Sequence, residues 1–243
     1  MNENYYAGAY WGPRMEPPEE CARRMEVFLA GLSEVGPSFV RWFQPGRSRK
    51  DALRRPIEPK REELARLVLR GRDRAFEDLG FHVSGWNGAG DDSDATGFDI
   101  HCGGYSSAVR NTCVFTLPGR GLNADRILTA PMLAGLLRAS AVAWEPDWGV
   151  ATSHAHGRLL DARSVKGAPR VGWVMYLASH RGTVPPLPAP VRVEHIKDRG
   201  TLLALTPERF TASNPEHVAL AERVWELLGR AGLLEPLPPQ PGG

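Results

Sequence analysis

The stretch from Gly80 to Gly119 constrains the fold more than any other part of the sequence, because it reads as several consecutive β-strands. Three runs of strand length within it are rich in apolar and aromatic residues: Phe81–Gly88, Thr96–Tyr105 and Asn111–Leu117. The acidic loop Ala89-Gly90-Asp91-Asp92-Ser93-Asp94 separates the first two runs. The stretch therefore predicts part of a β-sheet that is interrupted by one acidic loop.

The rest of the chain contains further strand-like runs and runs with helical periodicity. Strands are predicted at Tyr5–Trp11, Asp147–Thr152, Arg170–Ser179, Val191–Ile196 and Thr201–Leu205. Apolar residues that recur every three or four positions predict helices near residues 18–33, 59–71, 130–143 and 214–230. The pattern predicts an α+β fold, a mostly antiparallel sheet with helices packed mainly on one face.

No linker or internal repeat divides the chain, so we expect a single α+β domain over residues 1–234. The Pro- and Gly-rich residues 235–243 are expected to form a disordered tail. The last predicted helix begins with Ser213-Asn214-Pro215-Glu216, a capping-box pattern. In such a box Ser213 and Glu216 would bond to the free backbone N–H groups of the helix start.

A formal net charge of +2 hides two segments of opposite sign. Residues 41–74 contain twelve Lys or Arg against five Asp or Glu, which gives +7, whereas residues 75–109 contain six Asp or Glu and no Lys or Arg, which gives −6. A basic segment of this kind could bind a phosphate backbone. We favour the alternative that its arginines pair with nearby carboxylates, because no aromatic residues lie between them as stacking on bases would require.

Cysteine usage and the N-terminus indicate the compartment. Cys21, Cys102 and Cys113 cannot all pair, and no Cys-x-x-Cys spacing occurs, which favours a reducing environment. The N-terminus lacks the basic start and apolar core of a signal peptide, and no apolar run reaches the roughly 18 residues that span a bilayer. We therefore expect a cytoplasmic protein that does not associate with membranes.

Motifs for catalysis or metal binding are weak. The dyad His154 and His156 could offer two imidazoles to a metal, although the alternative is a pair of surface histidines in a polar loop. Further ligands would come from Asp161, His180 or His195. The acidic loop lacks the glycine and closing glutamate of a calcium loop, and the sequence contains no nucleophile elbow or phosphate-binding loop. On these grounds we expect no cofactor.

Three aromatic landmarks resemble those of the immunity protein 52 family of bacterial polymorphic toxin systems. They are Tyr5-Tyr6-Ala7-Gly8-Ala9-Tyr10-Trp11-Gly12, Trp86-Asn87-Gly88 and Trp144-Glu145-Pro146-Asp147-Trp148-Gly149. The likeness runs in order from about Tyr5 to Leu228. It implies a non-enzymatic α+β protein of the bacterial cytoplasm that binds and neutralises a cognate toxin. Such proteins are similar to those encoded beside toxins whose domain looks like a restriction-endonuclease fold.

The resemblance suggests occlusion as the mechanism. A nuclease presents a cationic groove to nucleic acid, and a surface rich in carboxylates can fill that groove by charge complementarity. The expected partner-binding residues are Asp91, Asp92, Asp94 and Asp99, with Trp86 and Asn87 at the base of the loop. A rival site is the basic segment around Arg47 to Arg55, which could hold an acidic toxin surface.

Two other classes of protein remain open at this point. A small metal-dependent hydrolase would use His154 and His156, and a nucleic-acid-binding module would use the Arg47–Arg55 segment. For the immunity protein we expect a toxin domain as partner, no direct contact with nucleic acid, and a monomer or a homodimer.

Overall fold

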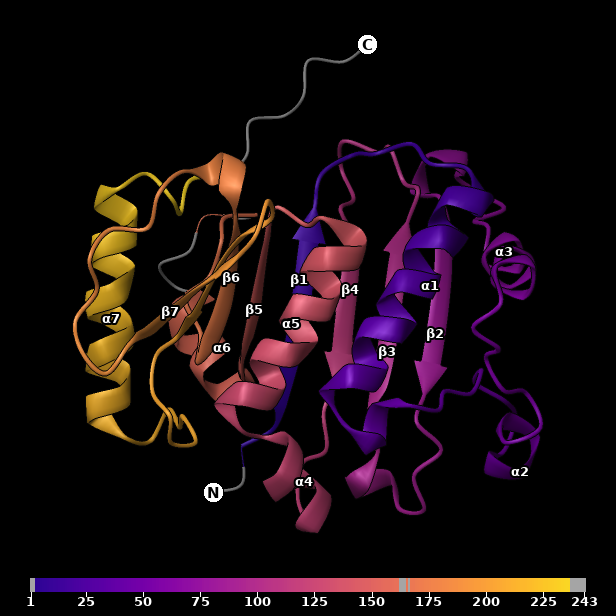
Figure 1. Ribbon diagram of the computed structural model, residues 1–243, viewed down its shortest axis with the longest axis horizontal. Helices are drawn as coiled ribbons and strands as arrows, with labels where there is room; N and C mark the ends of the chain where they lie inside the picture. Colours follow the sequence, from indigo (N-terminus) through magenta and orange to yellow (C-terminus); the bar gives the residue numbers. More distant parts are fainter. Residues whose placement is uncertain (1–2, 162–164, 166, 237–243) are drawn as a thin grey trace.

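Eight strands form one antiparallel sheet in the order β2-β3-β4-β1-β5-β6-β8-β7 (Figure 1). The computed structural model describes residues 3–161, 165 and 167–236. The strands are β1 (Tyr5–Trp11), β2 (Phe81–Trp86), β3 (Gly97–Cys102), β4 (Asn111–Thr116), β5 (Trp148–Ser153), β6 (Val174–Ala178), β7 (Arg192–Ile196) and β8 (Gly200–Ala204). The helices are α1 (Pro18–Val35), α2 (Arg49–Ala52), α3 (Arg61–Arg70), α4 (Leu122–Ile127), α5 (Ala130–Trp144), α6 (His154–Asp161) and α7 (Pro215–Arg230). Short 3₁₀ turns are η1 (Pro37–Phe39), η2 (Glu77–Leu79), η3 (Asp92–Asp94) and η4 (Ser179–Arg181).

The first strand of the chain, β1, lies inside the sheet between β4 and β5 and pairs with both over most of its length. The middle of β1 consists of small residues, Ala7-Gly8-Ala9. A glycine is required at position 8, because a Cβ added there would lie 2.4 Å from the Tyr10 hydroxyl oxygen. Tyr10 therefore folds back over the strand, and its ring stacks on Trp148 with a centroid distance of 4.4 Å.

One face of the sheet is covered by α1 and α5, which cross in front of the strands in Figure 1, with α3 packed beside α1. Residues at helical spacing on α1 point into the core, among them the fully buried Phe28. Its ring meets those of Phe98, Phe115 and Trp144 at centroid distances of 5.6, 5.7 and 6.1 Å. Burying a side chain of this kind contributes about 1.5–3 kcal/mol, so these contacts fix the helix on the sheet.

Among the described residues, helices cover the opposite face at one end only. All residues of β5 and β6 are buried, α6 packs on β5, and α7 lies beside α6. On β2, β3 and β4 burial alternates, because successive side chains of a strand point to opposite faces. We call the outward-facing residues of β1–β4 the open sheet face: Tyr6, Tyr10, His82, Ser84, Trp86, Asp99, His101, Thr112, Val114 and Thr116.

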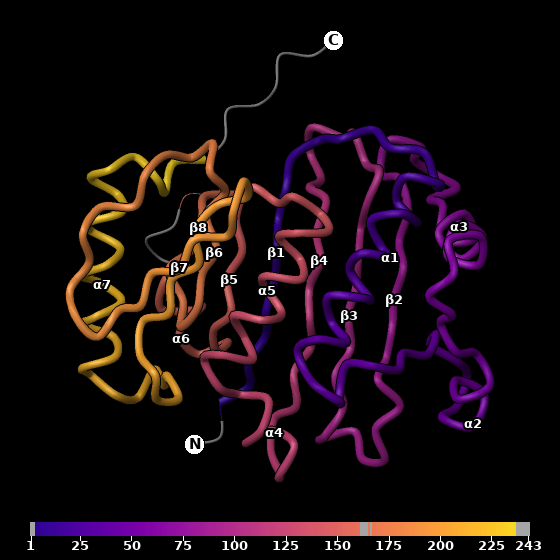
Figure 2. The backbone as a smooth tube through the Cα atoms, viewed as in Figure 1, coloured from indigo at the N-terminus to yellow at the C-terminus, as the bar shows by residue number. Residues whose placement is uncertain are grey.

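The predicted α+β fold with its antiparallel sheet is confirmed, and the backbone trace shows how β2, β3 and β4 follow one another (Figure 2). Two local predictions were wrong. The cap of α7 is Asn214, whose side chain accepts from the Glu216 N–H at 2.9 Å, and Ser213 lies outside the cap. His154 and His156 lie in α6 and not in a loop. Residues 237–243 of the predicted tail lie outside the described residues.

Candidate functional site

The acidic loop between β2 and β3 has a fixed shape. Asp91 caps η3, because its Oδ1 accepts from both the N–H and the hydroxyl of Ser93 at 2.7 Å. These two hydrogen bonds hold the pKa of Asp91 below its ordinary value. Asp91 and Asp92 are both exposed, so the loop presents two carboxylates to solvent, and Asp91 stays charged well below neutral pH.

The base of the loop is closed by Asn87. Its Oδ1 accepts from the backbone N–H of Ala89 at 3.3 Å and of Thr96 at 3.2 Å. Trp86 is half-buried against Phe43, and the guanidinium of Arg49 lies 5.9 Å from the centre of a Trp86 ring. The predicted residues Asn87 and Trp86 therefore support the loop from below and do not lie at its tip.

Asp94 and Asp99 differ from the two exposed loop aspartates. Asp94 is half-buried under α4, and its Oδ1 has no hydrogen-bond partner among the described residues. Asp99 lies on β3, on the open sheet face, where it accepts from the Ser84 hydroxyl at 2.5 Å and lies 3.3 Å from Nε2 of His82. The structure thus divides the four predicted aspartates among the loop tip, the loop interior and the sheet face.

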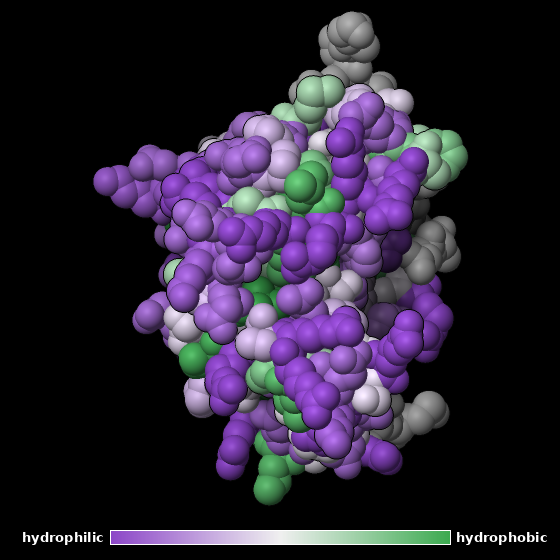
Figure 3. Space-filling model, turned by 90° about the vertical axis from the view of Figure 1, so that its right-hand side faces the viewer, coloured by the Kyte–Doolittle hydropathy of each residue, from purple (hydrophilic) through white to green (hydrophobic). Residues whose placement is uncertain are grey.

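The basic segment reaches the acidic loop. Arg49 donates to the carbonyl oxygen of Gly90, next to Asp91. Other arginines of the segment form exposed ion pairs: Arg55–Asp51, Arg61–Glu26, Arg66–Glu63 and Arg72–Glu77. Figure 3 shows this side of the molecule as mainly hydrophilic, with small separate hydrophobic patches. These pairs agree with the interpretation of the segment as a solvated, ion-paired surface.

The two histidines proposed for a metal lie in different environments. His154 is exposed at the start of α6, and its ring lies 4.9 Å from that of Tyr6, between centroids, in a tilted arrangement. His156 is buried, its Nδ1 lies 3.0 Å from the Thr152 hydroxyl, and burial lowers its pKa to about 4. Among the described residues there is no group of three or more His, Cys, Asp or Glu placed to hold a metal ion. The buried His156 therefore contributes to the packing of α6 on β5.

Two of the aromatic landmarks meet in space. Trp11 stacks on Trp144 at 5.7 Å, and the Asp147 carboxylate accepts from the Gly12 N–H at 2.9 Å. These landmarks join the end of β1 to the end of α5, so they have a structural role.

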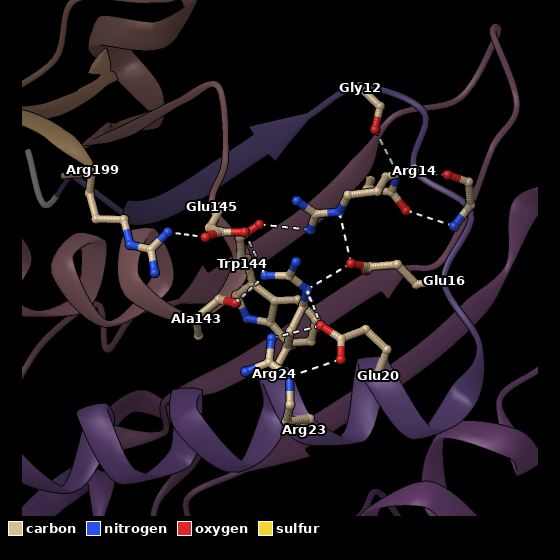
Figure 4. Close-up of polar contacts among 12 residues, drawn as sticks. Gly12, Arg14, Glu16, Glu20, Arg23, Arg24, Ala143, Trp144, Glu145 and Arg199 are labelled. Carbon is tan, nitrogen blue, oxygen red and sulfur yellow. Dashed lines mark hydrogen bonds and ion pairs between the residues drawn. The ribbon is translucent and has the colours of Figure 1, made fainter. Parts of the chain in front are cut away.

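A cluster of arginines and glutamates surrounds this junction (Figure 4). Arg24 is buried and bonds to Glu16 at 2.7 Å, to the Ala143 carbonyl at 2.9 Å and to Glu145 at 3.0 Å. Glu145 also pairs with Arg199, and its left-handed backbone, φ 49°, donates its N–H to the Ala141 carbonyl at 3.2 Å. Sequence reasoning missed this cluster, because Glu16 and Arg199 are separated by 183 positions and, of the charged members, only Glu145 lies in a landmark.

Within residues 3–161, 165 and 167–236, no helix is long and apolar enough to cross a membrane. The three cysteines are free and buried, and burial raises the pKa of the Cys113 thiol. For Cys102 the pKa is raised first by its hydrogen bond with Cys21 and then by burial. Thiols of this kind are poor nucleophiles.

The described part of the chain is thus an α+β protein with charged loops, an ion-paired helical side and a partly uncovered sheet. The chain belongs to the immunity protein 52 family, because the model of that family, Immunity protein 52, matches residues 3–237. The resemblance predicted from the aromatic landmarks is thereby confirmed.

Comparison with solved structures gives the same fold. The T6SS protein PA0821 of Pseudomonas aeruginosa is similar with a TM-score of 0.52 and 14% sequence identity, over 92% of this chain and 73% of that chain. At this identity the likeness concerns the fold alone. A comparison with curated proteins gave no match.

Proposed function

We propose that this immunity protein binds a cognate polymorphic toxin of nuclease type in the bacterial cytoplasm and occludes its active or substrate-binding groove. It acts by binding alone, without catalysis and without a cofactor. The observation that carries the proposal is the family match over residues 3–237. The acidic loop supplies a surface for the mechanism.

Charge complementarity is the physical basis of the occlusion. A nuclease groove that holds a phosphate backbone is lined by Lys and Arg, and exposed carboxylates such as Asp91 and Asp92 can occupy it. Opposite charges also speed the encounter of the two proteins. The hydrogen bonds of Asp91 and Asn87 order the loop in the free protein, so little conformational entropy is lost when it binds.

Calorimetric titration into the toxin domain encoded by the neighbouring gene tests the proposal, with nuclease activity measured on the same samples. We expect binding with a Kd on the order of nanomolar and loss of cleavage at a one-to-one ratio. Binding that leaves cleavage intact would contradict occlusion, and the absence of binding to any neighbour-encoded toxin would contradict the proposed function as a whole.

A further inference from the structure

We propose that the open sheet face, together with the adjoining Arg158 on α6, forms a second part of the toxin-binding surface and that its basic end, at Arg158, receives carboxylates of the toxin. This inference rests on the proposed function and names a surface beyond the acidic loop.

A hollow of about 370 Å³ marks the basic end of this face. It is lined by Tyr6, Tyr10, Thr116, His154, Arg158 and Arg170, among others. No Asp or Glu occurs among the described residues that line it. Among the described lining residues the exposed Arg158 carries the argument, because an exposed guanidinium favours an anionic group and its fork matches the geometry of a carboxylate.

The acidic end of the face lies one strand away. Asp99 pairs across the sheet with Val114, which itself lines the hollow. Directly paired residues of antiparallel strands point to the same face at about 5 Å, so Asp99 and the hollow are neighbours. The face is therefore bipolar, and a partner that fits it must place a basic group beside an acidic one.

Rigid aromatic side chains lie within the face. The Tyr6 ring packs on His154 in a tilted arrangement with centroids 4.9 Å apart, Tyr10 stacks on Trp148 at 4.4 Å, and both tyrosines are half-buried. Tyrosines held in this way offer large contact area at a low entropy cost, which is typical of residues that anchor an interface.

The area of the open sheet face indicates that this face and the acidic loop act together. Four strands at a spacing of about 4.8 Å, each of about six residues, span roughly 15–20 Å in each direction, or on the order of 300 Å². A standard interface buries about 800 Å² on each partner, so the face alone is too small. The acidic loop leaves the sheet after Trp86, the last residue of β2, and returns to it at Gly97, the first residue of β3. The loop is therefore a direct continuation of the face.

Substitutions within the face test the inference by calorimetry with the same toxin domain. Arg158→Glu removes an exposed positive charge from the hollow, and we expect Kd to rise about tenfold or more. Arg223→Glu, an exposed residue on α7, is the matched control and should change Kd by less than about twofold.

A pair of variants at one position separates charge from bulk. Thr116→Glu and Thr116→Lys add side chains of similar size at the exposed edge of the hollow. We expect the Glu variant to weaken binding several-fold more than the Lys variant. Circular dichroism and thermal unfolding of each variant confirm that the fold is retained.

The outcomes separate this inference from the proposed function. If the wild-type protein binds the toxin and Arg158→Glu, Thr116→Glu and Thr116→Lys bind it equally well, the face is an ordinary solvated sheet surface and the inference is wrong. Equal losses of toxin affinity for Thr116→Glu and Thr116→Lys would overturn the assignment of a carboxylate ligand. A wild-type dimer that Thr116→Lys converts to a monomer would show that a second copy covers the face. Failure of the wild-type protein itself to bind any neighbour-encoded toxin bears on the proposed function.

Discussion

The adjacent residues Arg23 and Arg24 each form an ion pair, one exposed and one buried, so they show how burial changes the contribution of an ion pair to stability. The guanidinium of Arg24 is nine-tenths buried and bonds to Glu16, which is also buried, whereas Arg23 next to it lies at the surface and pairs with Glu20. Removing Arg24 leaves the buried Glu16 in a medium of low polarity with the partly exposed Arg14, at 3.1 Å, as its remaining ion-pair partner. An exposed pair has water as a substitute.

Arg24→Met should therefore lower the free energy of unfolding by about 3 kcal/mol, and Arg23→Met by less than about 1 kcal/mol. Urea unfolding of the two variants measures both values. Similar losses for the two variants would show that the cluster in Figure 4 does not depend on the buried pair.

Asp92 tests the electrostatic part of toxin binding without disturbing the loop. Its carboxylate is exposed, whereas Asp91 caps η3 and Asp94 is half-buried, so Asp92→Asn changes charge with the least change in structure. We expect association in stopped-flow measurements to slow about twofold or more at low salt, and the difference to shrink as salt is added.

Asp198→Asn, at the tip of the β7–β8 hairpin, is the control, because Asn tolerates the positive φ of 58° found there. Equal association rates for both variants and the wild-type protein would exclude Asp92 from the encounter.

The elements of the fold followed from the sequence to different extents. Strands with alternating burial and helices with a clear apolar stripe, such as α1 and α7, were predicted close to their observed bounds. The short helices α4 and α6 were missed, because six or eight residues give little periodicity and α6 contains Gly157. Packing of the buried His156 on β5 stabilises α6, and a sequence pattern does not display such a contact.

The acidic loop was predicted from the sequence, whereas the positions of its aspartates were not, and the role of the loop in toxin binding stays a prediction. The acidic loop and its base were found from charge and aromatic landmarks. The position of Asp99 on the open sheet face was not predicted. It depends on which face of the sheet α1 and α5 cover, and the sequence pattern of β3 alone does not give that face. The hollow around Arg158 joins β1, β4 and α6, which are far apart in sequence.

The start of α7 allows a direct test of its cap. Asn214 satisfies the Glu216 N–H, so Asn214→Ala should lower the free energy of unfolding by about 1 kcal/mol, whereas Ser213→Ala should change it little. Thermal or urea unfolding compares the two. A larger loss for Ser213→Ala would restore the capping box expected from the sequence.

The stability of the whole molecule should fall in mild acid because of His156. Burial lowers its pKa to about 4, against about 6.5 in an unfolded chain. Between these values the unfolded state binds a proton that the folded state does not, so stability rises with pH. The contribution is fully present above pH 6.5, and about 2 kcal/mol of it should be lost by pH 5.

Urea unfolding at pH 7.5 and pH 5 measures this difference, and His156→Asn should reduce it. His154→Asn, in the exposed first turn of the same helix, is the matched control and should keep the wild-type pH dependence. The same pH dependence in the wild-type protein and in His156→Asn would assign the effect to other groups.

The strand order carries a consequence for how the protein is made. Of the eight strands of the sheet, β1 comes first in the sequence, yet its partners begin at residues 111 and 148, so both edges of β1 stay unpaired until those strands have been synthesised. An incomplete chain that stops before β5 keeps an exposed aromatic strand with one free edge, a form that is prone to aggregate. Translation must therefore run past residue 153 before the sheet can close around its first strand.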